Sequence, residues 1–489
     1  MTPLKVDQSN RTIYLVVFFV AIIYASISLV NHFLFRTYAL DLGLYTNAIY
    51  DYSHFSFNDS SVFKSVPQNL LADHFDLFLI LISPLSIIFG TSTLLVVQII
   101  FILIGGIGVL NFIRLKGADE KWARAGMIYF YLHFSIFSAL SFDYHSNVIA
   151  ASLVPWLFIV MEKKQIQRSF LILTLVIITK ENMALWMVFV CSGFYLLNRK
   201  QIGYRFIWGM TLFSFIYFMA VTVYIMPSLS IDHHFVQFKY SVLGNDYHSA
   251  LTTIFSHPMK VFEAMFVNTN LSKTGDYVKW ESWMFFVFSG GALLFFRPIY
   301  LWMLIPIFMQ KLLNDQMQTW GINDQYSIEL APILAMGIFS SGVFSLSPPI
   351  RRVVLPLAMI GSLICTVRAM DRTSTQMRRA NFRIYQIEHW RTEQNIFAIK
   401  VAMKLIPSDA IVASQNTILP HLAYRDKIYS LPIINDAQYI IYEKGFSSYP
   451  ISKEKLNTLA DSLENSSEWK VLFSKDNVRL LNREKISLK

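Results

Sequence analysis

Ionisable side chains gather near the ends of several apolar segments of this sequence, where they could support acid–base chemistry. The stretch "ALDLGLYTNAIY" (39–50) follows an apolar run and places one carboxylate, Asp41, between apolar neighbours. Three later stretches carry further acids, imidazoles and an ammonium group: "LADHFD" (71–76), "FDYHS" (142–146) and "TKEN" (179–182). Charged groups at membrane depth are costly, about 2.5–3.5 kcal/mol each on insertion scales, so these stretches are candidates for a functional site.

Each stretch also has a purely structural interpretation. Asp41 could cap the helix that "LGLYTNAIY" begins, which is a common use of aspartate. "LADHFD" could be a solvated entry to the next apolar helix, and His145 could simply satisfy a backbone group. Lys180 and Glu181 are harder to explain in this way, because they interrupt an apolar segment and need a partner or a cavity.

The composition indicates an integral membrane protein. Of the 489 residues, 54% are hydrophobic and only 15% are charged, whereas soluble domains contain about 25% charged residues. Apolar segments of about 17–25 residues, the length that crosses a bilayer, recur from Thr12 to near Arg368. The first apolar run, Thr12–Phe35, is too long for a signal-peptide core and lacks a cleavage site, so we expect it to be retained.

The positions of Lys and Arg predict the topology. Short loops rich in these residues stay cytoplasmic, and the loops 114–124, 162–168 and 198–205 qualify. With a cytoplasmic N-terminus, the loops 35–76 and 227–283 then lie outside, and we expect the piece Leu77–Phe89 to be re-entrant or interfacial. Roughly eleven spans are expected, an odd number that puts the C-terminus outside. Their approximate positions are 12–34, 91–113, 125–141, 147–161, 169–179, 182–197, 205–226, 284–296, 299–313, 327–345 and 353–369.

The predicted fold class is therefore mainly α: a polytopic membrane helix bundle, residues 1–369, with a small extracytoplasmic α/β domain, residues 370–489. In this domain an amphipathic pattern near 387–405 predicts a helix, and "KLNTLADSLEN" (455–465) predicts another. The expected strands are "AIVAS", "KIYSL" and "AQYIIYE", followed by a terminal hairpin in "WKVLFSKDNVRLLNR".

Several classes of function find no support in the sequence. There is no Walker loop, dinucleotide fingerprint, serine nucleophile elbow or HExxH motif, so ATP-driven transport is unsupported. The stretch "DHH" (232–234) lacks regular zinc-ligand spacing, and no metal site is predicted. The formal net charge is +10, but the basic residues are scattered over short loops and the tail, which does not predict nucleic-acid binding. Cys191 and Cys365 both lie in apolar spans, so no structural disulfide is expected.

A family resemblance adds to this interpretation. It is carried, in chain order, by "DLGLYTNAIY", "LADHFDLFLILISPL" (71–85), "FDYHSNVIAASLVPWLFI" (142–159), "TKENMALW" (179–186), "QYSIELAPIL" (325–334) and "IPSDAIVASQNTILPHLAYRDKIY" (406–429). These stretches resemble successive blocks of an uncharacterised bacterial family of predicted membrane proteins, domain of unknown function 2079. The family in turn resembles the GT-C superfamily of multispanning glycosyltransferases, which use polyprenyl-phosphate sugars and carry an acid in the first extracytoplasmic loop.

The resemblance implies sugar transfer with one carboxylate as general base, and cationic or hydrogen-bonding groups for the departing phosphate. By position the loop acid is Asp41. Its neighbours are apolar, whereas GT-C enzymes commonly show an acidic pair there, so Asp73 stays an alternative base. Lys180 is then a candidate phosphate partner, and Glu181 could orient Lys180 or bind an ion. The full set of expected substrate-binding residues is His74, Asp76, Tyr144, His145, Lys180 and Glu181.

The expected partners are a lipid-linked sugar donor, membrane lipids, and a glycan, lipid or protein acceptor. No nucleotide cofactor is expected, and a requirement for a divalent cation stays open. The expected location is the bacterial cytoplasmic (inner) membrane. The alternatives are a transporter or flippase of a lipid-linked glycan precursor, in which the same groups would line a path, and a non-enzymatic membrane assembly factor. Polar groups on one face favour transfer, because a transporter places them near the midplane.

Overall fold

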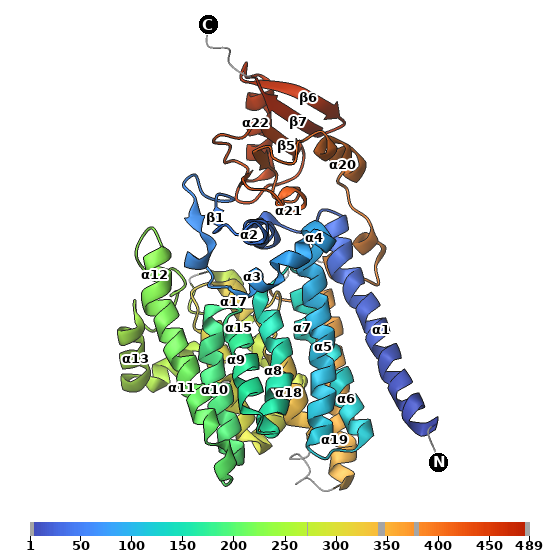
Figure 1. Cartoon of the computed structure of the whole chain (residues 1–489), viewed down its shortest axis with the longest axis vertical. Helices are drawn as coiled ribbons and strands as arrows, with labels where there is room; N and C mark the ends of the chain where they lie inside the picture. The colour runs from blue at the N-terminus through green and yellow to red at the C-terminus, as the bar shows by residue number, and fades with distance from the viewer. Residues whose placement is uncertain (1–3, 271, 341–347, 376–380, 485–489) are drawn as a thin grey trace.

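The computed structural model describes residues 4–270, 272–340, 348–375 and 381–484. A bundle of apolar helices forms the lower part of the molecule, and a small domain with a sheet stands above it (Figure 1). The predicted class, a membrane helix bundle with a small C-terminal α/β domain, is confirmed. The last part of the expected span 327–345 lies outside the described residues.

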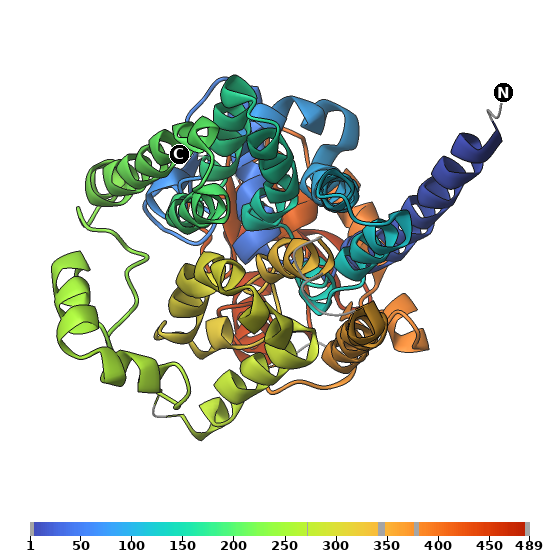
Figure 2. The same cartoon turned by 90° about the horizontal axis from the view of Figure 1, so that it is seen from below.

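The bundle is built from helices of very different lengths. Within the described residues, four continuous helical stretches are long and apolar enough to cross a membrane: 11–33, 78–115, 206–229 and 349–371. The stretches 78–115 and 206–229 each contain more than one of the helices named next. The helix bounds are α1 Leu4–Phe33, α3 Phe78–Ile82, α4 Ser86–Phe89, α5 Thr93–Leu115, α6 Glu120–Tyr131, α7 Phe134–Leu140, α8 Ser146–Glu162, α9 Ile166–Ile177, α10 Glu181–Asn198, α11 Phe206–Met219, α12 Met226–Leu229, α13 Tyr247–Ser256, α14 Pro258–Ala264, α15 Val278–Phe288, α16 Pro298–Leu312, α17 Met317–Trp320, α18 Leu330–Phe339 and α19 Pro348–Asp371. Seen from below, α13 and α14 lie at the periphery of the bundle (Figure 2).

Breaks between these helices fall where polar residues interrupt apolar sequence. The expected interruption at "TKEN" is present, since α9 ends at Ile177 and α10 begins at Glu181. The expected span 125–141 is divided into α6 and α7, because the His133 side chain accepts the N–H of Ser135 and starts a new helix. The piece 77–89 forms the short helices α3 and α4 at the upper end of α5 (Figure 1). The side of the membrane on which each loop lies stays a prediction.

The C-terminal domain contains a five-stranded mixed sheet in the order β4-β3-β5-β7-β6. The strands are β3 Val412–Ser414, β4 Ile428–Ser430, β5 Tyr439–Glu443, β6 Trp469–Lys475 and β7 Val478–Arg483, and the helices are α20 Ile396–Lys404, α21 Leu419–Leu422 and α22 Lys453–Glu464. The strands, the helix at 455–465 and the hairpin were all predicted. The prediction of one helix over 387–405 was wrong. Asn395 caps α20 by accepting the N–H of Ala398, so the residues before Asn395 lie outside this helix.

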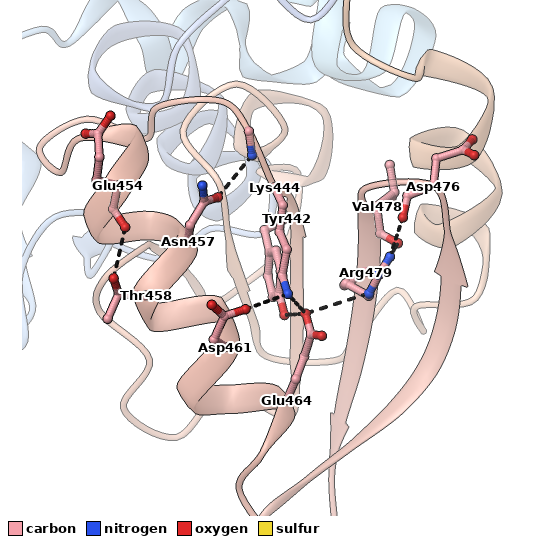
Figure 3. Close-up of polar contacts among 11 residues, drawn as sticks. Tyr442, Lys444, Glu454, Asn457, Thr458, Asp461, Glu464, Asp476, Val478 and Arg479 are labelled. Carbon is pink, nitrogen blue, oxygen red and sulfur yellow. Dashed lines mark hydrogen bonds and ion pairs between the residues drawn. The ribbon is translucent and has the colours of Figure 1, made fainter.

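Ion pairs join α22 to the sheet (Figure 3). The Lys444 ammonium contacts Asp461 and Glu464, both at 2.8 Å. The Tyr442 hydroxyl donates to Glu464 at 2.8 Å, and Arg479 approaches the same carboxylate at 3.7 Å. This cluster lies on the domain's own helix and strands, so it holds α22 in place.

The domain docks on the first loop after α1, which contains α2 (Leu44–Ser53) and the hairpin strands β1 (Asp59–Ser60) and β2 (Gln68–Asn69). Apolar side chains of the loop and of α20, α21 and the sheet share one buried cluster, in which Ala39 and Leu419 are fully buried. The backbone continues the contact, since the Ser430 N–H donates to the Val62 carbonyl at 2.7 Å. Loop and domain therefore form one packed unit.

We predict that Leu419→Ala loosens this contact. The Leu419 side chain packs so closely on the loop that a methyl group on Gly43 would lie 2.5 Å from Leu419 Cδ2. Removing a fully buried leucine costs about 2–5 kcal/mol of folding stability, so hydrogen exchange at residues 39–43 should become faster. Leu456→Ala is the control, because Leu456 is also fully buried but packs on the opposite face of the sheet. Equal acceleration at 39–43 in both variants would contradict the docking role.

Candidate functional site

A cavity of about 1150 Å³ opens among the bundle helices, the first loop and the C-terminal domain. Six of the eight sequence-predicted site residues line it: Asp41, Asp73, His74, His145, Lys180 and Glu181. Asp76 and Tyr144 are fully buried and lie outside this lining. Folding thus gathers side chains that are up to 140 residues apart in the sequence, as Asp41 and Glu181 are.

Asp41 lies in a single π-helical turn, Ala39–Gly43, that precedes α2. Such turns are rare and frequently occur at functional sites. The N–H of Tyr38 donates to the Asp143 carboxylate at 2.9 Å. The N–H of Ala39 donates to Asn416, to its backbone oxygen at 3.0 Å and to its side-chain Oδ1 at 2.9 Å. Because α2 begins at Leu44 with no side-chain cap, the alternative that Asp41 caps this helix is wrong.

The Asp41 carboxylate faces an imidazole. Its Oδ1 lies 3.9 Å from Nε2 of His145, which is too far for a hydrogen bond. His145 Nδ1 is 2.5 Å from the Tyr144 carbonyl, so Nδ1 carries the proton and the neutral ring presents a lone pair at Nε2. Burial, together with the charges of Lys180 and His74, holds the pKa of His145 well below its ordinary value. Two acceptor atoms therefore face each other across this gap, and an acceptor hydroxyl placed there could donate its one proton to either of them.

Gln98 fixes the loop that carries this imidazole. Its Nε2 donates to the Asp143 carbonyl at 3.0 Å, and its Oε1 accepts the N–H of His145 at 2.9 Å. Gln98 is fully buried in α5. The same loop thus supplies the Asp143 carboxylate to the Asp41 turn and the His145 ring to the cavity.

The loop before α3 contributes Asp73 and His74. Gln237 donates to Asp73 Oδ1 at 2.5 Å. His74 Nδ1 lies 3.4 Å from Glu181 Oε1, and Glu181 Oε2 accepts the N–H of Phe75 at 3.1 Å. Glu181 therefore ties this loop to the first turn of α10, rather than contacting Lys180 by a hydrogen bond.

Lys180 supplies a cation to the cavity. It precedes α10 with an extended backbone, and its side chain is half-buried. No residue that the structure describes forms a hydrogen bond or a close ion pair with its ammonium group. An anionic ligand group can therefore approach Lys180 without displacing a protein partner.

Sequence reasoning missed further charged residues that line the cavity. Lys311, at the end of α16, donates to the Gly321 carbonyl and, at 2.9 Å, to Ser327 Oγ. Glu329, just before α18, accepts the Asn147 amide at 2.9 Å. Charged residues in or beside apolar runs were the available signal. Asn416 carried no such signal, because it is a neutral residue of the C-terminal domain.

Part of the cavity lining is apolar. It consists of Leu185, Phe189, Phe215, Phe218, Met219, Leu251, Ile254 and Ile307, from α10, α11, α13 and α16. Phe215 and Leu251 are 48% and 56% exposed. The cavity thus combines this apolar lining with the polar lining described above, which we call its polar chamber. Among the described residues, no group of three or more His, Cys, Asp or Glu side chains is arranged to hold a metal ion.

The helix bundle and its docked α/β domain define a membrane protein of the GT-C fold class. A similar solved structure is the crystal structure of ArnT from Cupriavidus metallidurans bound to undecaprenyl phosphate, with a TM-score of 0.50 and 12% identity, covering 96% of this chain and 97% of ArnT. At this identity the likeness concerns the fold. The chain belongs to the family described as predicted membrane protein (DUF2079), whose family model matches residues 31–480. No curated protein sequence matches the chain.

The buried Asp76 carboxyl group has a structural role that can be tested by changing the pH. Its Oδ1 accepts the N–H groups of Phe78 and Leu79 at 3.0 and 3.3 Å, and burial raises its pKa to about 7. The folded state then holds a proton that the unfolded chain releases above about pH 4, so Asp76 lowers the stability as the pH rises from about 4 to about 7. We predict that Asp76→Asn, which keeps the acceptor oxygen, removes this decline in melting temperature.

Melting temperatures measured between pH 4 and pH 8 in detergent check this prediction. Asp59→Asn serves as control, because Asp59 is exposed in the same loop and should leave the wild-type profile unchanged. A variant at position 76 with the wild-type slope would show that Asp76 does not titrate in this range.

Proposed function

We propose that this protein is a membrane glycosyltransferase that transfers a sugar from a polyprenyl-phosphate-linked donor to an acceptor hydroxyl on the extracytoplasmic side. The observation that carries the proposal is one cavity that holds the Asp41–His145 pair, the Lys180 ammonium and an apolar part of its lining. Such a site suits a substrate with a hydrocarbon tail, a phosphate and a polar group. The GT-C fold shared with ArnT, whose crystal structure contains undecaprenyl phosphate, supports the same assignment.

The donor would bind along the length of the cavity. Its polyprenyl tail would lie against the aromatic and aliphatic side chains of α10, α11 and α13, where burial of apolar surface is favourable. Its phosphate would reach Lys180, and its sugar would extend into the polar chamber. A lipid from the bilayer would enter past Phe215 and Leu251, which line the cavity and are partly exposed.

The reaction needs one base. The acceptor hydroxyl attacks the anomeric carbon, a new carbon–oxygen bond forms, and the bond to the phosphate oxygen breaks with its electron pair leaving on the lipid phosphate. Asp41 accepts the hydroxyl proton, while the neutral His145 ring borders the other side of the gap. Lys180 stabilises the charge that remains on the departing phosphate.

Asp41 is favoured over Asp73 as the base. The Gln237 amide occupies one oxygen of Asp73, and the neighbouring His74 is paired with Glu181. Asp41 instead faces the buried imidazole directly, and its turn is fixed from two sides by Asp143 and Asn416. Fixed geometry of this kind is what a general base requires, because small displacements reduce proton transfer strongly.

Asp41→Asn is expected to lower turnover by about 10²- to 10⁴-fold while leaving donor binding within about threefold of wild type, because only the proton acceptor is lost. Purified protein is assayed for loss of polyprenyl-phosphate sugar and for transfer, with Asp59→Asn as the control outside the cavity. Wild-type turnover in Asp41→Asn would exclude Asp41 as the base. Equal loss in Asp73→Asn would favour the alternative acid.

Lys180→Gln is expected to weaken binding of polyprenyl phosphate by about tenfold or more, because a charge-assisted contact to phosphate is removed. Binding is measured by native mass spectrometry or fluorescence titration in nanodiscs. Lys64→Gln is the matched control, since Lys64 is exposed in the first loop and lies outside the cavity lining. Undiminished binding in Lys180→Gln would place the phosphate elsewhere. Lipid transport into vesicles without sugar turnover would support the flippase alternative instead.

A further inference from the structure

Among the amide side chains that line the cavity, four come from different parts of the chain and share one feature: Asn147, Asn182, Gln310 and Gln325. They come from α8, α10, α16 and the segment before α18. Each holds a buried polar atom for which no described residue supplies a hydrogen-bond partner. Buried amide atoms are nearly always hydrogen-bonded in proteins, so a group of unpartnered ones in a cavity wall points to a ligand.

Asn182 and Gln310 form one pair. Asn182 Nδ2 donates to Gln310 Oε1 at 2.9 Å, which leaves Asn182 Oδ1 and Gln310 Nε2 without a partner. Exchanging oxygen and nitrogen in both amides reverses the bond and again leaves one acceptor and one donor. The pair therefore offers both kinds of group whichever orientation is present.

Asn147 and Gln325 form the second pair. Asn147 Nδ2 donates to Glu329 Oε1 at 2.9 Å and to the Gln325 carbonyl at 3.3 Å. Asn147 Oδ1 and Gln325 Oε1 remain without a partner, although these residues are only 6% and 7% exposed. This pair adds two acceptors to the wall.

Three charged groups that line the same cavity, Lys311, Glu329 and Glu181, are already satisfied by the protein. Lys311 binds the Gly321 carbonyl and Ser327, Glu329 binds Asn147, and Glu181 binds His74. Besides Lys180, what remains for a ligand is a mixture of neutral donors and acceptors. Hydroxyl groups both donate and accept, so they match this mixture, whereas a carboxylate only accepts and would lie near Glu181 and Glu329.

We infer that Asn147, Asn182, Gln310 and Gln325 form a subsite for the ring of an uncharged sugar. The inference rests on the proposed function and names its donor class: a neutral hexose or pentose, rather than an acidic sugar. Lys180, the cation assigned to the donor phosphate, lines the same cavity and precedes Asn182 by two residues in the sequence. A sugar in the subsite would therefore have its anomeric carbon next to that phosphate.

The test compares two ligands on the full chain in nanodiscs: polyprenyl phosphate, and polyprenyl-phosphate hexose. Gln310→Met and Gln325→Met remove the amide while conserving volume. Each should weaken binding of the hexose lipid by about tenfold or more and leave binding of polyprenyl phosphate unchanged. Gln318→Met is the control, because Gln318 lines the cavity but has no buried unpartnered atom. A polyprenyl-phosphate hexuronate should bind about tenfold more weakly than the hexose lipid to wild type.

Equal weakening for both lipids, no weakening, or equal affinity for hexose and hexuronate would overturn the subsite. A separate measurement distinguishes this from failure of the proposed function. Saturation-transfer NMR with a soluble methyl hexoside should show contact with wild type and reduced contact with Gln310→Met. If wild type binds the hexoside but not polyprenyl phosphate, the lipid-donor proposal fails while the sugar subsite stands. If the hexoside does not bind, the subsite fails.

Discussion

The structure depends on how the chain satisfies two backbone N–H groups, those of Tyr38 and Ala39. Buried backbone donors need acceptors, and a π-helical turn leaves the residues before it without helical partners. Asp143 of the bundle supplies one acceptor and Asn416 of the C-terminal domain supplies the other. The turn that carries Asp41 is therefore defined by two regions that meet only in the folded protein, and the extramembrane domain is part of the candidate site.

The buried charged side chains of the bundle also have hydrogen-bond partners. Burial of ions is tolerated when the protein provides hydrogen bonds, and each buried charged group near the cavity has them: Glu181 from His74 and the Phe75 N–H, and Lys311 from a carbonyl and a hydroxyl. Lys180 differs, since its half-buried ammonium faces the cavity. Charged groups that already have hydrogen-bond partners in the protein hold the structure together. Lys180, which has no such partner among the described residues, is proposed to contact the substrate.

The shape of the cavity links this chemistry to the bilayer. A cavity lined both by apolar side chains and by charged and amide side chains suits a ligand that is itself part lipid and part water-soluble. The break between α9 and α10 is tolerated because Lys180 and Glu181 line this cavity rather than continuous lipid.

The sequence by itself determined the membrane bundle, the small α/β domain and the interruption at "TKEN", because these follow from apolar length, strand alternation and charge placement, which are local properties. It also selected Asp41, His74, His145 and Lys180, since ionisable groups stand out in apolar sequence. Tertiary structure alone decided that Asp76 and Tyr144 lie behind the cavity wall, that Glu181 pairs with His74, and that neutral residues such as Asn416 and Gln325 face the chamber. Amides are common in loops and carry no charge signal, so their role depends on which distant atoms they meet.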